Sequence, residues 1–209
     1  TLKKIDPNYR TAHFGKWDHR FDEVSPEQVG YDKSDGATGN GEGGSRNSGG
    51  PAAKEDPKLI DHITDSAIDF MKNCQKEKKP FYVQLSHYAV HLDIFYKQKT
   101  LDLLKSRPLG KLHKYPEFAA MTEDMDSSMG RLLQELSKLG LKNNTYIIFM
   151  SDNGGREDLP DHKSANLNTP LRSGKGKMYE GGIRVPFTIS GPGIKAGSHS
   201  KVSVSGVDI

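Results

Sequence analysis

In the stretch Thr145-Tyr-Ile-Ile-Phe-Met-Ser-Asp-Asn-Gly-Gly155, an uninterrupted apolar run ends abruptly on a carboxylate, a carboxamide and two glycines. An apolar run without polar alternation is typical of a central parallel strand that is covered on both faces. In open α/β sheets the ligand crevice lies beyond the carboxyl ends of such strands. We therefore expect Asp152 and Asn153 at the rim of a site. Gly154 and Gly155 would let the backbone turn sharply and approach a ligand closely.

The chemistry of this strand ending has two interpretations. Adjacent Asp and Asn side chains offer the hard oxygen ligands that Ca²⁺ or Mg²⁺ prefers. A plain strand followed by an Asx-turn uses the same residues. The local sequence does not separate these alternatives.

The segments before this strand predict a parallel α/β sheet. A strand is predicted over Pro80–Ser86, where apolar residues alternate, and polar groups follow it up to His91. A helix is predicted from Pro116 to Leu139, with one apolar stripe. This strand-helix-strand order favours parallel pairing. We interpret the acidic side chains on that helix as a solvated face, because nothing nearby would push their pKa values apart; they are Glu123, Asp124 and Asp126.

The first half of the chain predicts a further strand and helix. Arg10–Trp17 reads as a short strand whose glycine turn presents Lys16. Asp56-Pro57 predicts a helix start, with the carboxylate as N-cap and proline at the first helical position. The single cysteine, Cys74, falls on the apolar stripe of this helix, which indicates a core residue and excludes an internal disulfide. Segment 30–51 is rich in glycine and indicates either a flexible linker or an ordered loop over an active site.

Composition excludes several classes of protein. The 209 residues are 33% hydrophobic and carry a net charge of +3. That charge is too small to indicate a nucleic-acid-binding protein, and no basic block is interleaved with aromatic residues. No stretch is apolar enough to span a membrane, and no signal peptide opens the chain. Gly174-Lys175-Gly176 lacks the spacing of a P-loop, although a lysine between two glycines can meet an anion as a point charge.

Four stretches resemble one family, the formylglycine-dependent sulfatases of the alkaline-phosphatase-like superfamily. Residues 9–17, Tyr-Arg-Thr-Ala-His-Phe-Gly-Lys-Trp, are similar to the family's Gly-Tyr-x-Thr-x-x-x-Gly-Lys-Trp-His motif, and residues 88–91 are similar to its Ala-Pro-His segment. Residues 118–155 match its helix, turn and Ser-Asp-Asn-Gly metal strand. Residues 171–186 match its Leu-Arg-x-Gly-Lys-Gly-x-x-Tyr-Glu-Gly-Gly-Ile-Arg-Val-Pro signature. The resemblance implies an alkaline-phosphatase-like α/β sandwich, with a central, largely parallel sheet flanked by helices and incomplete at both ends.

The resemblance implies a role for each matching residue. Asp152 and Asn153 would be two ligands of a divalent cation, usually Ca²⁺ with Mg²⁺ possible, that binds the sulfate group and the hydrated formylglycine. Lys16 and Lys175 would contact sulfate oxygens, where cations neutralise charge in the transition state. His91 would hydrogen-bond the sulfate and the leaving-group oxygen as general acid.

One position departs from the family's pattern inside a matching motif. The family's second histidine directly follows Gly-Lys-Trp, but this chain has Asp18 there and His19 one residue later. Three alternatives remain open at this point. His19 substitutes as a catalytic residue through a shifted turn, Asp18 is the functional residue, or neither is.

Two parts of the family's site have no counterpart in the sequence. The nucleophile is made from the Cys or Ser of a Cys/Ser-x-Pro-x-Arg motif, which neither Cys74-Gln-Lys-Glu-Lys78 nor Ser106-Arg-Pro-Leu-Gly110 matches. The aspartate pair that completes the metal site is expected upstream of Lys16. We therefore interpret residues 1–209 as a partial sulfatase catalytic domain, with 30–51 as a Gly-rich loop. The nucleophile segment and a C-terminal subdomain are expected outside the chain.

The implied function is hydrolysis of an aryl or carbohydrate sulfate ester. The expected partner is a sulfated small molecule or glycan, and the expected location is periplasmic, extracellular or lysosomal. A phosphoesterase or phosphonate hydrolase of the same superfamily is one alternative. Asn153 argues against it, because zinc-dependent relatives typically place an Asp-His pair there and imidazole binds zinc better than a carboxamide. A non-catalytic pseudo-sulfatase that keeps only a binding cleft is the other alternative.

Overall fold

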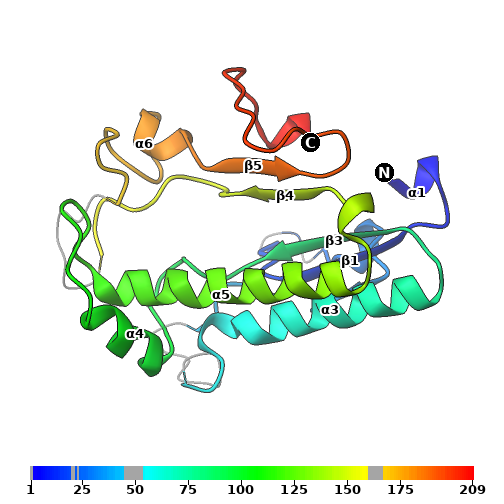
Figure 1. Ribbon diagram of the computed structural model, residues 1–209, viewed down its shortest axis with the longest axis horizontal. Helices are drawn as coiled ribbons and strands as arrows, with labels where there is room; N and C mark the ends of the chain where they lie inside the picture. The colour runs from blue at the N-terminus through cyan, green and yellow to red at the C-terminus, as the bar shows by residue number, and fades with distance from the viewer. Residues whose placement is uncertain (1, 20–21, 23, 45–53, 160–166) are drawn as a thin grey trace. The chain divides into compact units, whose positions relative to one another are not determined.

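The computed structural model describes residues 2–19, 22, 24–44, 54–159 and 167–209 (Figure 1). The chain divides into two compact units, Thr1–Gly140 and Leu141–Ile209. The first unit contains α1 (Leu2–Ile5), β1 (Arg10–Gly15), β2 (Lys33–Ser34), α3 (Ile60–Lys76), β3 (Phe81–Ser86), α4 (Gln98–Lys105) and α5 (Pro116–Lys138). The second contains β4 (Ile147–Met150), α6 (Glu180–Ile183) and β5 (Phe187–Ser190). Short 3-10 turns lie at Glu27–Val29, Pro57–Leu59, Lys142–Asn144 and Gly206–Asp208.

The first unit is built on a three-stranded parallel sheet with strand order β2-β1-β3. β1 pairs with β3 in a register that runs from Arg10 opposite Phe81 to Gly15 opposite Ser86. Because side chains alternate along a strand, Ala12 and Phe14 fall on one face of β1, and both are fully buried. Phe14 meets Phe70 of α3 edge-on, with ring centroids 6.3 Å apart. The prediction of a parallel sheet is confirmed for this unit, but the parallel neighbour of β3 is β1 and not the strand that follows α5.

The two long helices of the first unit, α3 and α5, run side by side (Figure 1). Their contact contains a buried hydrogen bond of 2.6 Å between the hydroxyl groups of Thr64 and Ser128. Ile60 and Met121 form the apolar centre of this contact together with Ala89. Cys74 is 3% exposed, which confirms the prediction of a core residue. In the described part of the chain, no helix is both long enough and apolar enough to cross a membrane.

The predicted start of the first long helix, with Asp56 as N-cap and Pro57 at the first position, is a 3-10 helix over Pro57–Leu59, and the α-helix itself begins one turn later. α3 begins at Ile60, because Lys58 and Leu59 have φ values of +65° and +51° and interrupt the helical backbone. Asp56 still caps the helix. Its carboxylate accepts hydrogen bonds from the backbone N–H groups of Asp61 (2.9 Å) and His62 (2.8 Å), which satisfies two of the unpaired donors of the first turn.

The Gly-rich segment is ordered over its described part, residues 30–44. β2 lies within it and pairs with β1, where Lys33 stands opposite Ala12. The backbone N–H of Asp32 donates to the carbonyl of Thr11 at 2.8 Å. The linker interpretation is therefore wrong for this part. The remainder of the predicted loop, 45–51, lies outside the described residues.

The interpretation of the acidic residues on α5 as a solvated face is wrong for Asp124. Asp124 is only 5% exposed. Its carboxylate accepts hydrogen bonds from the backbone N–H of Lys97 (2.7 Å) and the hydroxyl of Thr100 (2.6 Å). Asp124 thus holds the start of α4, a helix that the sequence pattern did not reveal.

The strand from which the sequence interpretation started also differs from expectation. β4 pairs with β5 in a two-stranded antiparallel sheet, in which Ile147 stands opposite Ser190. Ile148, Phe149 and Met150 are 41%, 42% and 40% exposed. The expectation of a parallel strand covered on both faces is therefore wrong for β4. A two-stranded sheet cannot cover its own two faces, and the described residues of this unit do not provide helices that would cover them.

Candidate functional site

The carboxyl ends of β1 and β3 place two predicted site segments at one edge of the sheet. Lys16 directly follows β1, and the backbone N–H of Lys16 donates to the carbonyl of Ser86, the last residue of β3, at 2.8 Å. The segment from His87 to His91 directly follows β3. The first unit therefore brings the turn that carries Lys16 next to the loop that carries His91, as parallel strands require.

A loop after β2 fixes the turn that carries Lys16. The Asp35 carboxylate accepts a 2.7 Å hydrogen bond from the Gly15 N–H and a 3.0 Å bond from His62. The Thr38 hydroxyl donates to the Gly15 carbonyl at 2.5 Å and accepts from the Trp17 N–H at 3.1 Å. The Thr38 carbonyl accepts from the N–H of Asp18 at 2.7 Å. Every residue from Gly15 to Asp18 thus has its backbone N–H bound.

Glycine is required where β1 ends. Gly15 has a φ of +97°, and a Cβ atom there would lie 2.2 Å from the Ser86 carbonyl oxygen. Any larger residue would force the two strand ends apart and displace Lys16.

Asp18, and not His19, contacts Lys16. The Lys16 ammonium lies 3.2 Å from a carboxylate oxygen of Asp18, and the two side chains are 22% and 24% exposed. His19 stacks on the Trp17 ring, with centroids 4.6 Å apart, and lies 3.1 Å from the Asp22 carboxylate. Because the His19 side chain is 42% exposed and already engaged by these neighbours, the described contacts favour Asp18 as the partner of Lys16.

The loop after β3 holds His91 by its backbone and by its ring. The His91 N–H donates to the Tyr88 carbonyl at 2.8 Å, and Nδ1 lies 2.8 Å from the Leu92 carbonyl oxygen. A carbonyl oxygen can only accept, so Nδ1 carries the proton in the neutral ring and Nε2 is the acceptor nitrogen. Tyr88 and Ala89 are buried and anchor the loop, and burial raises the pKa of the Tyr88 hydroxyl to about 12.

Two histidines lie near these strand ends: His13 is buried, and His87 is half-buried with both ring nitrogens shielded from solvent. His13 is hydrogen-bonded to the Ser86 hydroxyl through Nε2 at 3.0 Å, and burial lowers its pKa. The ring nitrogens of His87 have no partner among the described residues, and burial lowers the pKa of His87 to about 4. Both rings are therefore neutral at physiological pH.

In the second unit, the turn after β4 is bound to the segment that carries Lys175. The Lys175 N–H donates to the Gly155 carbonyl at 2.8 Å, and the Gly154 N–H donates to the Gly182 carbonyl at 2.9 Å. Asn168 binds both sides of this contact: its side-chain oxygen accepts from the Gly155 N–H at 2.8 Å, and its amide nitrogen donates to the Gly155 carbonyl at 2.8 Å and to the Ser173 carbonyl at 3.1 Å. Asp152 and Lys175 therefore belong to one packed turn region.

Gly154 and Gly174 lie where the chain packs closely against itself. A Cβ atom on Gly154 would lie 1.8 Å from the Gly181 carbonyl oxygen. A Cβ atom on Gly174 would lie 2.4 Å from the Gly155 carbonyl oxygen. These glycines allow two stretches of the chain to pack backbone against backbone, so the close approach that they permit is to the chain itself.

Asp152 and Asn153 fit part of the coordination shell of a hard cation. Asp152 is exposed, and the Asn153 amide nitrogen donates to the Gly154 carbonyl at 3.0 Å, which leaves the side-chain oxygen as the group that could bind a cation. Ca²⁺ takes six to eight oxygen ligands, and these residues supply two side chains. Within the described ranges, no group of three or more His, Cys, Asp or Glu side chains could complete such a shell.

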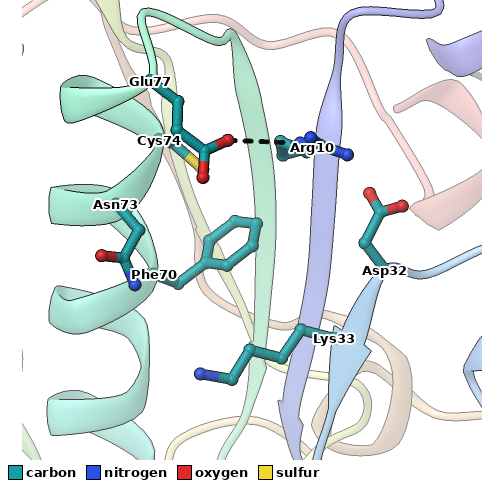
Figure 2. Close-up of a pocket in the computed structure, with 7 residues that line it drawn as sticks. All are labelled: Arg10, Asp32, Lys33, Phe70, Asn73, Cys74 and Glu77. Carbon is teal, nitrogen blue, oxygen red and sulfur yellow. Dashed lines mark ion pairs between the residues drawn. The ribbon is translucent and has the colours of Figure 1, made fainter.

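A pocket of about 180 Å³ lies between β1, β2 and α3, and it contains none of the predicted site residues (Figure 2). Arg10 and Glu77 face each other across it at 3.6 Å, and Asp32 pairs with Lys3 at 2.6 Å. Cys74 is one of the residues that line the pocket, and burial raises the pKa of its thiol, so the thiol is a poor nucleophile. Paired charges and an inert thiol give this pocket no evident chemistry.

Sequence reasoning missed the residues that hold the site turns in place. Asp35, Thr38 and Asn168 act by bonding their side chains to distant backbone groups. Such contacts have no spacing or composition that marks them in a sequence. A short polar residue beside glycines was the only available signal, and it is common in ordinary turns.

Comparisons with known proteins point to one family. The family model described as Sulfatase matches residues 6–209. A protein named Sulfatase from Formosa agariphila is 33% identical over 148 residues, covering 65% of this chain and 25% of that protein. The N-acetylgalactosamine-6-sulfatase of Canis lupus familiaris is 30% identical over 141 residues, covering 66% of this chain and 25% of that enzyme. The chain thus spans about a quarter of the length of these relatives.

A solved structure extends the similarity to three dimensions. The crystal structure of PsFucS1 sulfatase from Pseudoalteromonas sp. aligns with a TM-score of 0.66 and 27% sequence identity. The alignment covers 90% of this chain and 43% of that one. The predicted α/β fold of the alkaline-phosphatase-like type is therefore confirmed.

Proposed function

This chain belongs to the sulfatase family, and from that premise we propose that it is part of an enzyme that hydrolyses a sulfate ester. The observation that carries the proposal is the pairing of site segments within each unit. Lys16 and the His91 loop share one sheet edge, and Asp152 and Lys175 share one turn region. These are the four positions at which the family's motifs place a charged or acid-base group.

In this proposal, the two lysines bind the non-bridging oxygens of the sulfate group. Lys16 lies on a turn in which each backbone N–H from Gly15 to Asp18 is hydrogen-bonded, so the backbone of the turn needs little reorganisation when an anion binds. Lys175 is exposed and follows Gly174, whose lack of a side chain brings the lysine backbone onto Gly155. Fixed cations stabilise charge in the transition state more effectively than mobile ones.

His91 serves as the general acid. Because Nδ1 of the ring is directed to the Leu92 carbonyl, the imidazolium form presents its second proton at Nε2. That proton would pass to the bridging oxygen as the bond to sulfur breaks, since negative charge develops on this oxygen. His19 remains the weaker candidate for a catalytic role, because its ring is stacked on Trp17 and faces Asp22.

A divalent cation and a covalent nucleophile complete the proposal. Asp152 and Asn153 would hold the cation, Ca²⁺ or Mg²⁺, together with further oxygen ligands from outside the described residues. When bound, the cation supplies positive charge to the sulfate oxygens and to the nucleophile. The nucleophile would be formylglycine, formed in a segment of the parent protein that carries the missing motif.

The proposed substrate class is a sulfated sugar or a sulfated small molecule. An N-acetylgalactosamine-6-sulfatase at 30% identity supports a carbohydrate sulfate. We place the parent enzyme in the periplasm, the extracellular space or the lysosome. A non-catalytic relative remains the alternative, because the nucleophile motif is missing from these residues.

The test is kinetic and uses the full-length, formylglycine-bearing parent. His91→Ala should slow alkyl or sugar sulfates much more than an activated nitrophenyl sulfate, because only poor leaving groups need a proton. Lys175→Ala should lower kcat/KM for both classes to a similar extent, about 10²-fold. If His91→Ala slows both classes equally while Lys175→Ala shows the leaving-group dependence, the two roles are reversed. A parent without turnover of any sulfate ester would support the non-catalytic alternative.

A further inference from the structure

The sulfatase motif at the end of β1 differs in this chain at one position, and that position contacts the proposed sulfate-binding lysine. Asp18 stands directly after Gly-Lys-Trp, and its carboxylate lies 3.2 Å from the Lys16 ammonium. Both side chains are about three-quarters buried, so solvent screens this pair less than it screens a surface pair. An anion bound at Lys16 would therefore meet a fixed negative charge next to the lysine.

The backbone shows that this arrangement is built into the turn. Asp18 has a φ of +57°, a conformation that Asp and Asn adopt more readily than other side-chain-bearing residues. Its N–H donates to the Thr38 carbonyl at 2.7 Å, and the preceding Trp17 N–H donates to the Thr38 hydroxyl. The carboxylate is thus held beside Lys16 by its own main chain.

We propose that Asp18 is a specificity-determining residue that makes this anion site select monoanionic sulfate esters over dianionic phosphate esters. The inference rests on the proposed function, in which Lys16 binds the ester group. Coulomb energy is proportional to the charge of the ligand. A sulfate monoester carries one negative charge, whereas a phosphate monoester carries about two above pH 7. The repulsion from Asp18 is therefore twice as large for the phosphate ester.

This reasoning gives a relation between two measurements. If neutralising Asp18 improves the binding of a monoanion by some factor, it improves the binding of a dianion by the square of that factor. With the charges roughly 6 Å apart and the dielectric constant of water, the factors are about threefold for the monoanion and about tenfold for the dianion. Because the pair is partly buried, these factors are lower limits. Both factors should shrink at high salt, because mobile ions screen the repulsion.

The experiment titrates the ¹⁵N-labelled 209-residue chain with phenyl sulfate and with phenyl phosphate at pH 8, and follows the backbone amides of Gly15 to Asp18. The test variant is Asp18→Asn, which keeps the shape of the side chain and tolerates the positive φ. Asp69→Asn, on the exposed side of α3, is the matched control, since it changes the net charge by the same amount. Lys16→Gln should remove the titration of these amides by both esters.

The expected result is a larger gain for phenyl phosphate than for phenyl sulfate in Asp18→Asn, with no change of this ratio in Asp69→Asn. Equal gains for both esters, or no gain for either, would overturn the role of Asp18. A ratio change that is the same at low and high salt would also overturn it, because the cause would then be steric. The measurement requires no turnover, so a parent without sulfatase activity would refute the proposed function and leave this result standing.

Discussion

Replacing Thr38 by valine should loosen the turn that presents Lys16. The Thr38 hydroxyl bonds the Gly15 carbonyl at 2.5 Å and the Trp17 N–H at 3.1 Å, and valine has the same shape without a polar atom. Two partly buried backbone groups would lose their partner. At about 1 kcal/mol for each lost hydrogen bond, the free energy of unfolding of the first unit should fall by about 2 kcal/mol.

Thr38→Ser is the matched control, because serine keeps both hydrogen bonds and loses only a methyl group, at a cost below about 1 kcal/mol. Urea unfolding measures the global effect. Amide hydrogen exchange at Trp17 measures the local effect, which should accelerate about 30-fold in Thr38→Val, since each 1.4 kcal/mol is a factor of ten. A valine variant as stable as the serine variant, with unchanged exchange at Trp17, would refute this account of the turn.

Three further predictions concern stability. Gly15→Ala should lower the free energy of unfolding of the first unit by more than about 3 kcal/mol in urea, because the added methyl group would lie 2.2 Å from a carbonyl oxygen. The control Gly36→Ala, at φ +84° with nothing within 4 Å, should cost about 1–2 kcal/mol. Equal costs would contradict the packing argument. Asp124→Ala should cost about 2–3 kcal/mol and speed amide exchange in α4, while Asp126→Ala, on the exposed side of α5, should change stability by less than about 0.5 kcal/mol. Burial lowers the pKa of Lys58 from 10.5 to about 8, so above pH 8 the unfolded chain binds more protons than the folded chain. The melting temperature should therefore rise between pH 8 and about 9.5. A Lys58→Met variant that keeps this rise would show that another group is responsible.

The sequence predicted the parts of the fold that depend on local periodicity. Alternation in β3 and the apolar stripes of α3 and α5 follow from which side of each element faces the core. The strand-helix-strand order predicted a parallel sheet, but it did not show that β1 is the strand that pairs with β3. The core position of Cys74 has the same origin. These features need no knowledge of distant residues, because each element carries its own pattern.

The errors arose where a side chain's surroundings come from elsewhere in the chain. Asp124 lies among acidic residues that the sequence interpretation placed on a solvated face, but the start of α4, more than 20 residues earlier in the chain, supplies its two hydrogen-bond donors. The sequence of β4 is apolar, but its pattern cannot show which neighbouring residues cover it. The candidate site residues were proposed from motifs. The side chains that hold them, such as Thr38 and Asn168, lie outside any motif and were not found.

The β4–β5 ribbon bears on how this chain behaves in concentrated solution. Ile147–Met150 is uncharged, contains no proline and is rich in β-branched and aromatic residues, and each strand of the ribbon has one neighbour in its sheet. A strand with an open outer edge and an apolar surface is a template on which a second molecule can add its own strand. The segment that ends in Asp152 is therefore also liable to start aggregation whenever it is left uncovered. A charged residue at Phe149, where the side chain is 42% exposed, is the substitution that should suppress this self-association with the least disturbance of the site turn.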